Sequence, residues 1–224
     1  MPSIPFPKKK VPRGVAIEEL AILERTYPQP KTALEYTSDF ELLVSVILSA
    51  QTTDARVNMT TPALFAKYPT PEKLARAKQP DVESIIRSTG FFRMKAKNII
   101  ACARDIVERF GGEVPHGRGE LESLAGVGRK TASVVMAAAF DEPALAVDTH
   151  VFRVSHRLGL TLGTSPRQVE EDLTKLVPPK KWGDTTHWLI LHGRAICKAP
   201  TPQCPRCPVN ALCPTPKIIA RLSS

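Results

Sequence analysis

The chain has 224 residues, of which 42% are hydrophobic, so it is long enough for one large domain or two smaller domains with cores of their own. Lys and Arg number 31 against 22 Asp and Glu, and the net charge of +9 favours a polyanionic partner, with nucleic acid ahead of a membrane surface. No apolar run approaches the ~18 residues of a membrane span, and no signal-peptide core follows the N-terminus. We therefore expect an intracellular protein with no membrane partner, in a compartment that disfavours disulfides.

The first fourteen residues, MPSIPFPKKKVPRG, combine four prolines with a run of three lysines. Proline blocks regular structure, and lysines can contact phosphates. Residues 1–14 are predicted to form a flexible basic arm, with a solvated tail as the simpler interpretation.

Helical patterns begin at Val15, and residues 15–27 place apolar side chains along one face. Residues 39–51 are apolar on almost all sides, which predicts a central buried helix, and Asp39 is its candidate N-cap. The pair Thr70-Pro71 predicts an N-cap followed by proline at the first helical position.

Later helices carry equally clear end signals. Residues 93–110 stop at Gly111-Gly112, and Cys102 falls on their apolar face as a small core residue. Ser165 and Gln168 form a capping box, and Asp184 is a candidate cap for the last long helix. No segment shows the alternation of exposed strands, so the predicted fold class is all-α.

A glycine turn lies between two predicted helices at residues 124–132, LAGVGRKTA. Gly126 and Gly128 flank Val127, and such a turn directs backbone N–H groups outward just before a helix start. These donors and the helix dipole can bind a phosphate oxygen without reading base sequence. A purely structural hairpin is the alternative.

Two side chains near this turn could carry chemistry. Lys130 lies in the first turn of the following helix, where a cation is disfavoured and a neutral, nucleophilic amine is favoured. An ordinary phosphate-contacting lysine is the alternative. Asp148 precedes another helix, where it could act as an N-cap, as a carboxylate that stabilises positive charge on a sugar, or as both.

Four cysteines lie within seventeen residues near the C-terminus: Cys197, Cys204, Cys207 and Cys213. Thiols this close are expected to meet at one point. Their spacing is compatible with an iron–sulphur cluster, with zinc or with disulfides.

Together, LAGVGRKTA, VDTHVFRV, HWLILHGR, SAQTTD and the four-cysteine spacing resemble the endonuclease III family of helix–hairpin–helix DNA glycosylases. The resemblance covers nearly all of the chain from Val15 to Cys213. It implies a six-helix barrel domain with the hairpin over residues 32–142. It also implies a cluster domain from residues 15–31 and 143–224, with DNA held in the cleft between the two.

The resemblance also implies a base-excision repair enzyme that removes oxidised pyrimidines and cleaves the abasic site by β-elimination. Lys130 corresponds to the nucleophile that forms the Schiff base, and Asp148 to its partner carboxylate. Gln51 corresponds to the residue that fills the hole left by the flipped base. Phe91 occupies the place of a second wedge, which is usually leucine.

Further site residues follow from the same resemblance. The hairpin residues expected to contact DNA are Gly126, Val127, Gly128, Arg129 and Thr131. The four C-terminal cysteines are expected to bind a 4Fe-4S cluster. The expected partner is double-stranded DNA with damaged bases or abasic sites, bound by a monomer.

Two alternative functions stay open. A monofunctional relative such as an adenine-mismatch glycosylase typically lacks the lysine and carries an additional C-terminal domain, whereas here Lys130 is present and eleven residues follow Cys213. A non-catalytic DNA-binding module with a structural metal has no need for Lys130 and Asp148 together.

Overall fold

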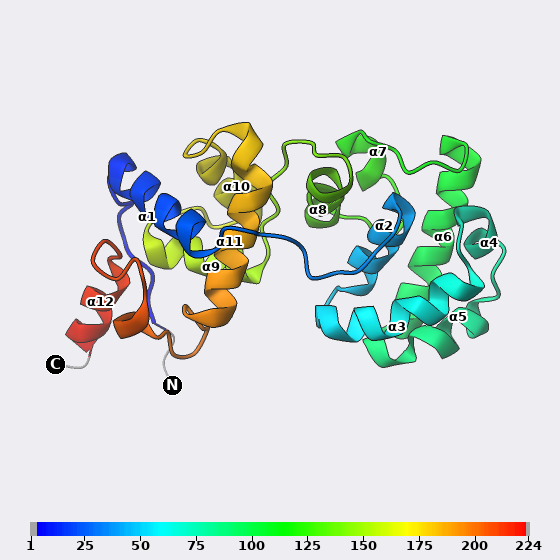
Figure 1. Ribbon diagram of the computed structural model, residues 1–224, viewed down its shortest axis with the longest axis horizontal. Helices are drawn as coiled ribbons and strands as arrows, with labels where there is room; N and C mark the ends of the chain where they lie inside the picture. The colour runs from blue at the N-terminus through cyan, green and yellow to red at the C-terminus, as the bar shows by residue number, and fades with distance from the viewer. Residues whose placement is uncertain (1–3, 223–224) are drawn as a thin grey trace. The chain divides into compact units, whose positions relative to one another are not determined.

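The computed structural model describes residues 4–222, and its regular elements are α-helices and short 3-10 turns without any strand in that range (Figure 1). The all-α prediction is confirmed. Within the same range, no helix combines the length and apolar character that a membrane span needs. The chain divides into two compact units, a middle unit of Thr32–Glu142 and a terminal unit of Met1–Lys31 with Pro143–Ser224.

The middle unit is a bundle of helices around one hydrophobic core. Its elements are α2 (Asp39–Leu48), α3 (Asp54–Lys67), α4 (Pro71–Ala75), α5 (Gln79–Ile86), η1 (Arg87–Thr89), α6 (Phe92–Phe110), α7 (Arg118–Glu122) and α8 (Arg129–Ala139). Helix α2 is buried over almost its whole length, as its apolar sequence predicts, and it contacts α3, α6 and α8. Helix α6 packs against α4 and α5 on its other side.

Most helix ends in this unit follow the sequence signals. Thr70 caps α4 with Pro71 at its first position, and α6 ends at Gly111 in the left-handed conformation. Cys102 is fully buried, and burial raises the pKa of its thiol to about 12, which suits a packed core residue. The predicted cap Asp39 is wrong by one residue: the side chain of Ser38, in extended conformation, accepts from the Glu41 N–H and starts α2.

The terminal unit has a separate core built from both ends of the chain. Its elements are α1 (Arg13–Thr26), α9 (Thr149–Leu158), α10 (Pro166–Thr174), η2 (Pro179–Lys181), α11 (Trp182–Ala195), η3 (Cys204–Arg206) and α12 (Thr215–Leu222). Helix α11 contacts both α1 and α9. The capping box from Ser165 to Gln168 is confirmed at the start of α10.

The predicted cap of α11 is wrong. Helix α11 begins at Trp182, directly after the η2 turn, so Asp184 lies inside the first helical turn. An acidic side chain is stabilising in that turn because it faces the positive end of the helix dipole.

The proline-rich N-terminal segment is predicted as a flexible arm. Its residues 1–3 lie outside the described range, and the residues that follow contact other parts of the terminal unit. Phe6 stacks on His156 with ring centroids 4.6 Å apart, and Lys10 pairs with Asp172 at 2.6 Å. The Val11 N–H donates to the Gly159 carbonyl. Lys10 is therefore engaged with a carboxylate rather than presented to a phosphate.

Candidate functional site

The turn between α7 and α8 contains two glycines, and the backbone requires glycine at one of them but not at the other. Gly126 has φ +79°, and a Cβ there would come within 2.9 Å of the Asn98 Cβ. Gly128 has φ −100°, and a Cβ added there would meet no atom within 4 Å. The fold therefore requires glycine at position 126 only, and a close approach from outside the chain would explain Gly128.

Helix α8 begins without a side-chain cap because its N-cap residue is Gly128. Within residues 4–222, five other helices have a capping hydroxyl or carboxylate in that place, at Ser38, Thr53, Thr70, Asp148 and Ser165, whereas α1, α5, α6 and α11 also begin without a side-chain cap. Arg129 and Lys130, the first two residues of α8, are exposed, whereas Val127 is buried under the turn. The first turn of α8 thus leaves N–H donors and two basic side chains at the surface, an arrangement suited to an anion.

Gln51 and Phe91 share an unusual backbone conformation. In the described range, the non-glycine residues with positive φ are Gln51 (54°), Phe91 (48°) and Asp141 (53°). Gln51 follows α2 in a turn and is exposed, and the Phe91 side chain is 68% exposed just before α6. Backbone strain of this kind concentrates at ligand-contacting positions.

Lys95 joins the segments that carry these two residues. Its Nζ lies 2.7 Å from the Leu48 carbonyl oxygen, 2.7 Å from Thr52 Oγ1 and 2.8 Å from the Thr89 carbonyl oxygen. The Thr52 hydroxyl also donates to the Thr89 carbonyl. Burial lowers the pKa of Lys95 to about 8.

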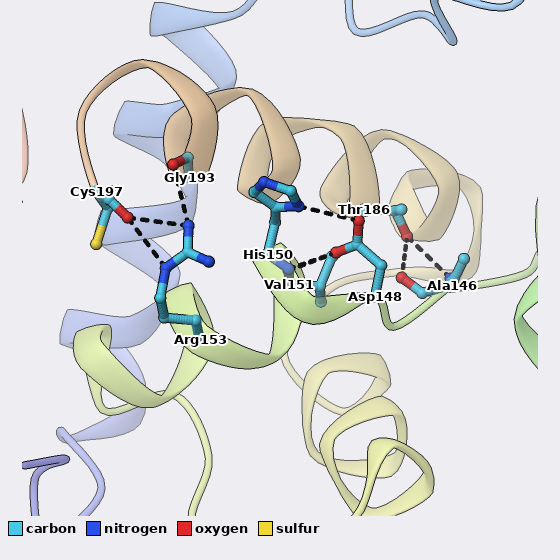
Figure 2. Close-up of polar contacts among 8 residues, drawn as sticks. All are labelled: Ala146, Asp148, His150, Val151, Arg153, Thr186, Gly193 and Cys197. Carbon is cyan, nitrogen blue, oxygen red and sulfur yellow. Dashed lines mark hydrogen bonds and ion pairs between the residues drawn. The ribbon is translucent and has the colours of Figure 1, made fainter. Parts of the chain in front are cut away.

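Asp148 is the N-cap of α9 in the terminal unit (Figure 2). Its Oδ1 accepts from the N–H groups of His150 and Val151, both at 2.8 Å, while Oδ2 lies 3.3 Å from His150 Nδ1. The backbone of Ala146, two residues before Asp148, is held as well. Thr186 Oγ1 on α11 donates to the Ala146 carbonyl and accepts from the Ala146 N–H. The capping role predicted for Asp148 is confirmed, and its Oδ2 takes no part in the cap.

The four C-terminal cysteines line one pocket and form no disulfide. His192 and Arg157 contribute to the same wall. The described residues contain no group of three or more His, Cys, Asp or Glu side chains placed to hold a metal ion, although all four cysteines line this pocket.

Two arginines of α9 hold the loop that begins with Cys197. Arg153 donates to the carbonyls of Gly193 and Cys197 (Figure 2). Arg157 is buried, and its guanidinium donates to the carbonyls of Lys198 and Ala199 at 2.6 and 2.7 Å and lies 3.6 Å from Cys197 Sγ. Helix α9 therefore carries Asp148 at one end and a buried cation beside the cysteine pocket at the other.

Comparisons with known proteins identify the chain. Residues 44–179 match the model of the HhH-GPD superfamily base excision DNA repair protein. Endonuclease III of Synechocystis sp. is 51% identical over 201 residues, which cover 89% of this chain and 92% of that protein. Endonuclease III of Escherichia coli strain K12 is 45% identical over 197 residues, covering 88% and 93%. The chain belongs to the endonuclease III family.

Solved structures agree with this assignment. The trapped covalent intermediate of endonuclease III with DNA, in its estranged-adenine complex, superposes with a TM-score of 0.89. Its sequence is 43% identical, and the match covers 95% of this chain and 99% of that one. This member of the endonuclease III family is accordingly a base-excision repair DNA glycosylase with abasic-site lyase activity.

The expected site residues of this endonuclease III relative fall in both units. Gln51, Phe91 and the hairpin with Lys130 belong to the middle unit, and Asp148 and the cysteines to the terminal unit. Sequence reasoning missed Lys95, Arg153 and Arg157. Lys95 had a detectable signal, because it lies on the apolar stripe of α6, four residues before Ile99. Arg153 and Arg157 had none, because only the tertiary fold brings α9 beside the cysteine loop.

Proposed function

We propose that this protein is a bifunctional member of the endonuclease III family that excises oxidised pyrimidines from duplex DNA and then cleaves the strand through a Schiff base on Lys130. The observation that carries the proposal is an exposed Lys130 in the first turn of α8, which follows a glycine turn and begins without a side-chain cap. The structural relative described above is a trapped covalent endonuclease III–DNA intermediate, and a covalent intermediate with DNA is the species that such a lysine would form.

In the proposed reaction, the hairpin binds the DNA backbone through the N–H groups of the α8 first turn. The Lys130 amine attacks C1′ of a nucleotide flipped out of the duplex, forming a C–N bond as the glycosidic bond breaks and the base departs with a proton. Ring opening yields the Schiff base. Loss of a C2′ proton then expels the 3′ phosphate and cuts the strand.

Asp148 is proposed to support positive charge on the sugar and to assist proton transfer through Oδ2. Its other oxygen is engaged in the α9 cap, which fixes the carboxylate orientation. Gln51 would fill the space of the flipped nucleotide, and the exposed ring of Phe91 would wedge into the stack as an apolar side chain.

Cys197, Cys204, Cys207 and Cys213 are proposed to bind a 4Fe-4S cluster. The shared pocket supports this, as does the buried Arg157 cation beside it, because a cluster with four thiolate ligands carries net negative charge. When bound, the cluster would tie α11, the cysteine loop and the segment before α12 together. A repair enzyme of this kind acts on the chromosome, so we place it with the DNA of the cell.

The monofunctional and non-catalytic alternatives are not favoured. Both would leave the exposed Lys130 without a role, and the relatives that align over most of the chain are endonuclease III enzymes.

Borohydride reduction on a panel of lesion duplexes tests the proposal. Wild-type enzyme should trap covalently on oxidised pyrimidines and on abasic sites, and Lys130→Ala should abolish trapping while binding to the lesion stays within about threefold, because the backbone donors remain. Arg129→Ala is the matched control, since it removes a neighbouring cation but keeps the nucleophile. If Lys130→Ala still forms the covalent complex with DNA, the nucleophile is another residue.

A further inference from the structure

Lys95 is a buried cation for which the proposed reaction has no use. Its side chain is 4% exposed, and it lies near the start of α6, where the helix dipole disfavours positive charge. Burying a charge is costly unless it is fully hydrogen-bonded. An apolar side chain at this position would fill the core without the free-energy cost of burying a charge. The reason for a lysine therefore lies in the groups that its ammonium contacts.

The ammonium contacts enclose the turn that carries Gln51. Its acceptors include the carbonyl of Leu48, three residues before Gln51, and the hydroxyl of Thr52, one residue after it. Both bonds measure 2.7 Å. The turn is therefore fixed on either side of its residue of positive φ.

The same group also holds the segment that carries Phe91. Its third acceptor is the carbonyl of Thr89, two residues before Phe91, and the Lys95 backbone N–H donates to the Phe91 carbonyl at 3.1 Å. Thr52 bridges the two segments through its own bond to Thr89. All three ammonium protons thus have acceptors, divided between the two segments.

We infer that Lys95 is a positioning residue that locks the Gln51 turn and the Phe91 turn to each other, so that both side chains enter damaged duplex DNA as one preorganised unit. The inference rests on the insertion roles proposed above for Gln51 and Phe91. Because strained backbone persists only when its surroundings hold it, loss of the ammonium should release both turns together.

The test compares covalent trapping on duplex and on single-stranded abasic DNA. Only the duplex has a gap to fill and a stack to enter, so Lys95→Met should slow duplex trapping by about ten- to a hundredfold while single-stranded trapping stays within about twofold. Equal losses on both substrates would overturn the inference and leave Lys95 as a stability residue. Lys97→Met, which removes an exposed lysine of the same helix, should leave the ratio of the two rates unchanged.

A second readout follows the insertion itself. A duplex with 2-aminopurine opposite a tetrahydrofuran abasic analogue reports unstacking of the opposite base by fluorescence at saturating protein. Lys95→Met should reduce the wild-type fluorescence change, and it should add little to a Gln51→Ala/Phe91→Ala double variant. A full additional loss in that double variant would contradict action through the two turns.

Thr52→Val covers the case in which Lys95→Met does not fold. It removes one acceptor of the ammonium group and the bridge to Thr89 but preserves side-chain size, and the same selective loss on duplex DNA is expected. If Gln51→Ala and Phe91→Ala leave duplex trapping and fluorescence unchanged, the proposed insertion roles fail. If those variants are impaired while Lys95→Met and Thr52→Val match wild type, the inference about Lys95 fails alone.

Discussion

At the scale of single residues, the oxygen of Asp148 that caps α9 is distinct from the oxygen that we propose takes part in the reaction. Oδ1 accepts both capping bonds, and an Asn side chain can keep them. We expect Asp148→Asn to leave thermal stability nearly unchanged but to slow base release by roughly a hundredfold, because it removes the charge that we propose supports the sugar cation. Single-turnover rates on a lesion duplex and on a pre-formed abasic site measure this. Equal losses on the two substrates would assign Asp148 to the lyase step or to the cap alone.

Glu19 of the terminal unit places a carboxyl group in a buried position that is unfavourable for its charged form. Its side chain is fully buried, neither carboxylate oxygen has a hydrogen-bond partner within residues 4–222, and burial raises its pKa from 4.5 to about 8. Between these values the folded chain keeps a proton that the unfolded chain loses. Stability therefore falls as pH rises through this window, by about 1.4 kcal/mol per unit.

Glu19→Leu should consequently stabilise the protein, and by about 2 kcal/mol more at pH 8 than at pH 6. Chemical denaturation at the two pH values measures the difference. The matched change at the exposed neighbour, Glu18→Leu, should show no such pH dependence. A gain of the same size at both pH values would mean that Glu19 is ionised in the folded protein throughout.

At the scale of elements, the two glycines of the hairpin allow folding and the proposed DNA binding to be tested separately. Gly128 is not needed by the fold, so Gly128→Ser should keep or raise the melting temperature, since serine is a good N-cap. It should nevertheless weaken binding to lesion and undamaged duplex alike, because its side chain occupies the donors and blocks a phosphate. Gly126→Ala should lower stability through its positive φ and its contact with Asn98. If Gly128→Ser binds DNA as well as wild type, the hairpin is not part of the DNA interface.

Arg157 is one of the two arginines that link α9 to the cysteine loop. Arg157→Met would leave the carbonyls of Lys198 and Ala199 without this donor and should cost about 3 kcal/mol or more. For the 4Fe-4S cluster proposed above, we expect purified Arg157→Met to contain less iron than wild type and to show less of the broad absorbance near ~400 nm that such a cluster gives. Arg167→Met, at an exposed arginine of α10, should retain both. Full iron content in Arg157→Met would show that the cysteines alone hold the cluster.

At the scale of the whole molecule, the charge of +9 should dominate DNA affinity. The logarithm of the association constant should fall linearly with the logarithm of salt concentration, with a slope of about −0.9 per phosphate neutralised. Binding isotherms over a salt series on lesion and undamaged duplexes measure this slope. Nearly parallel lines are expected, because the phosphate contacts are common to both, whereas a flat response would assign the affinity to base contacts.

The sequence by itself determined the all-α fold class, several helix ends and the family of this protein. Helix starts at Thr70 and Ser165 and the stop at Gly111 could be predicted because capping depends on a few neighbouring residues. The spacing of the hairpin, Lys130, Asp148 and the cysteines was likewise sufficient for the family, since each motif is local and their order is preserved along the chain.

Only the tertiary structure decided what surrounds these residues. The burial of Lys95 and Glu19, the arginines behind Cys197 and the stacking of Phe6 on His156 all depend on contacts between segments far apart in the sequence. Local propensity contains no information about such partners. The positive φ of Gln51 and Phe91 belongs to the same class, because neither is a glycine and their strained conformation persists only where the surrounding fold holds it.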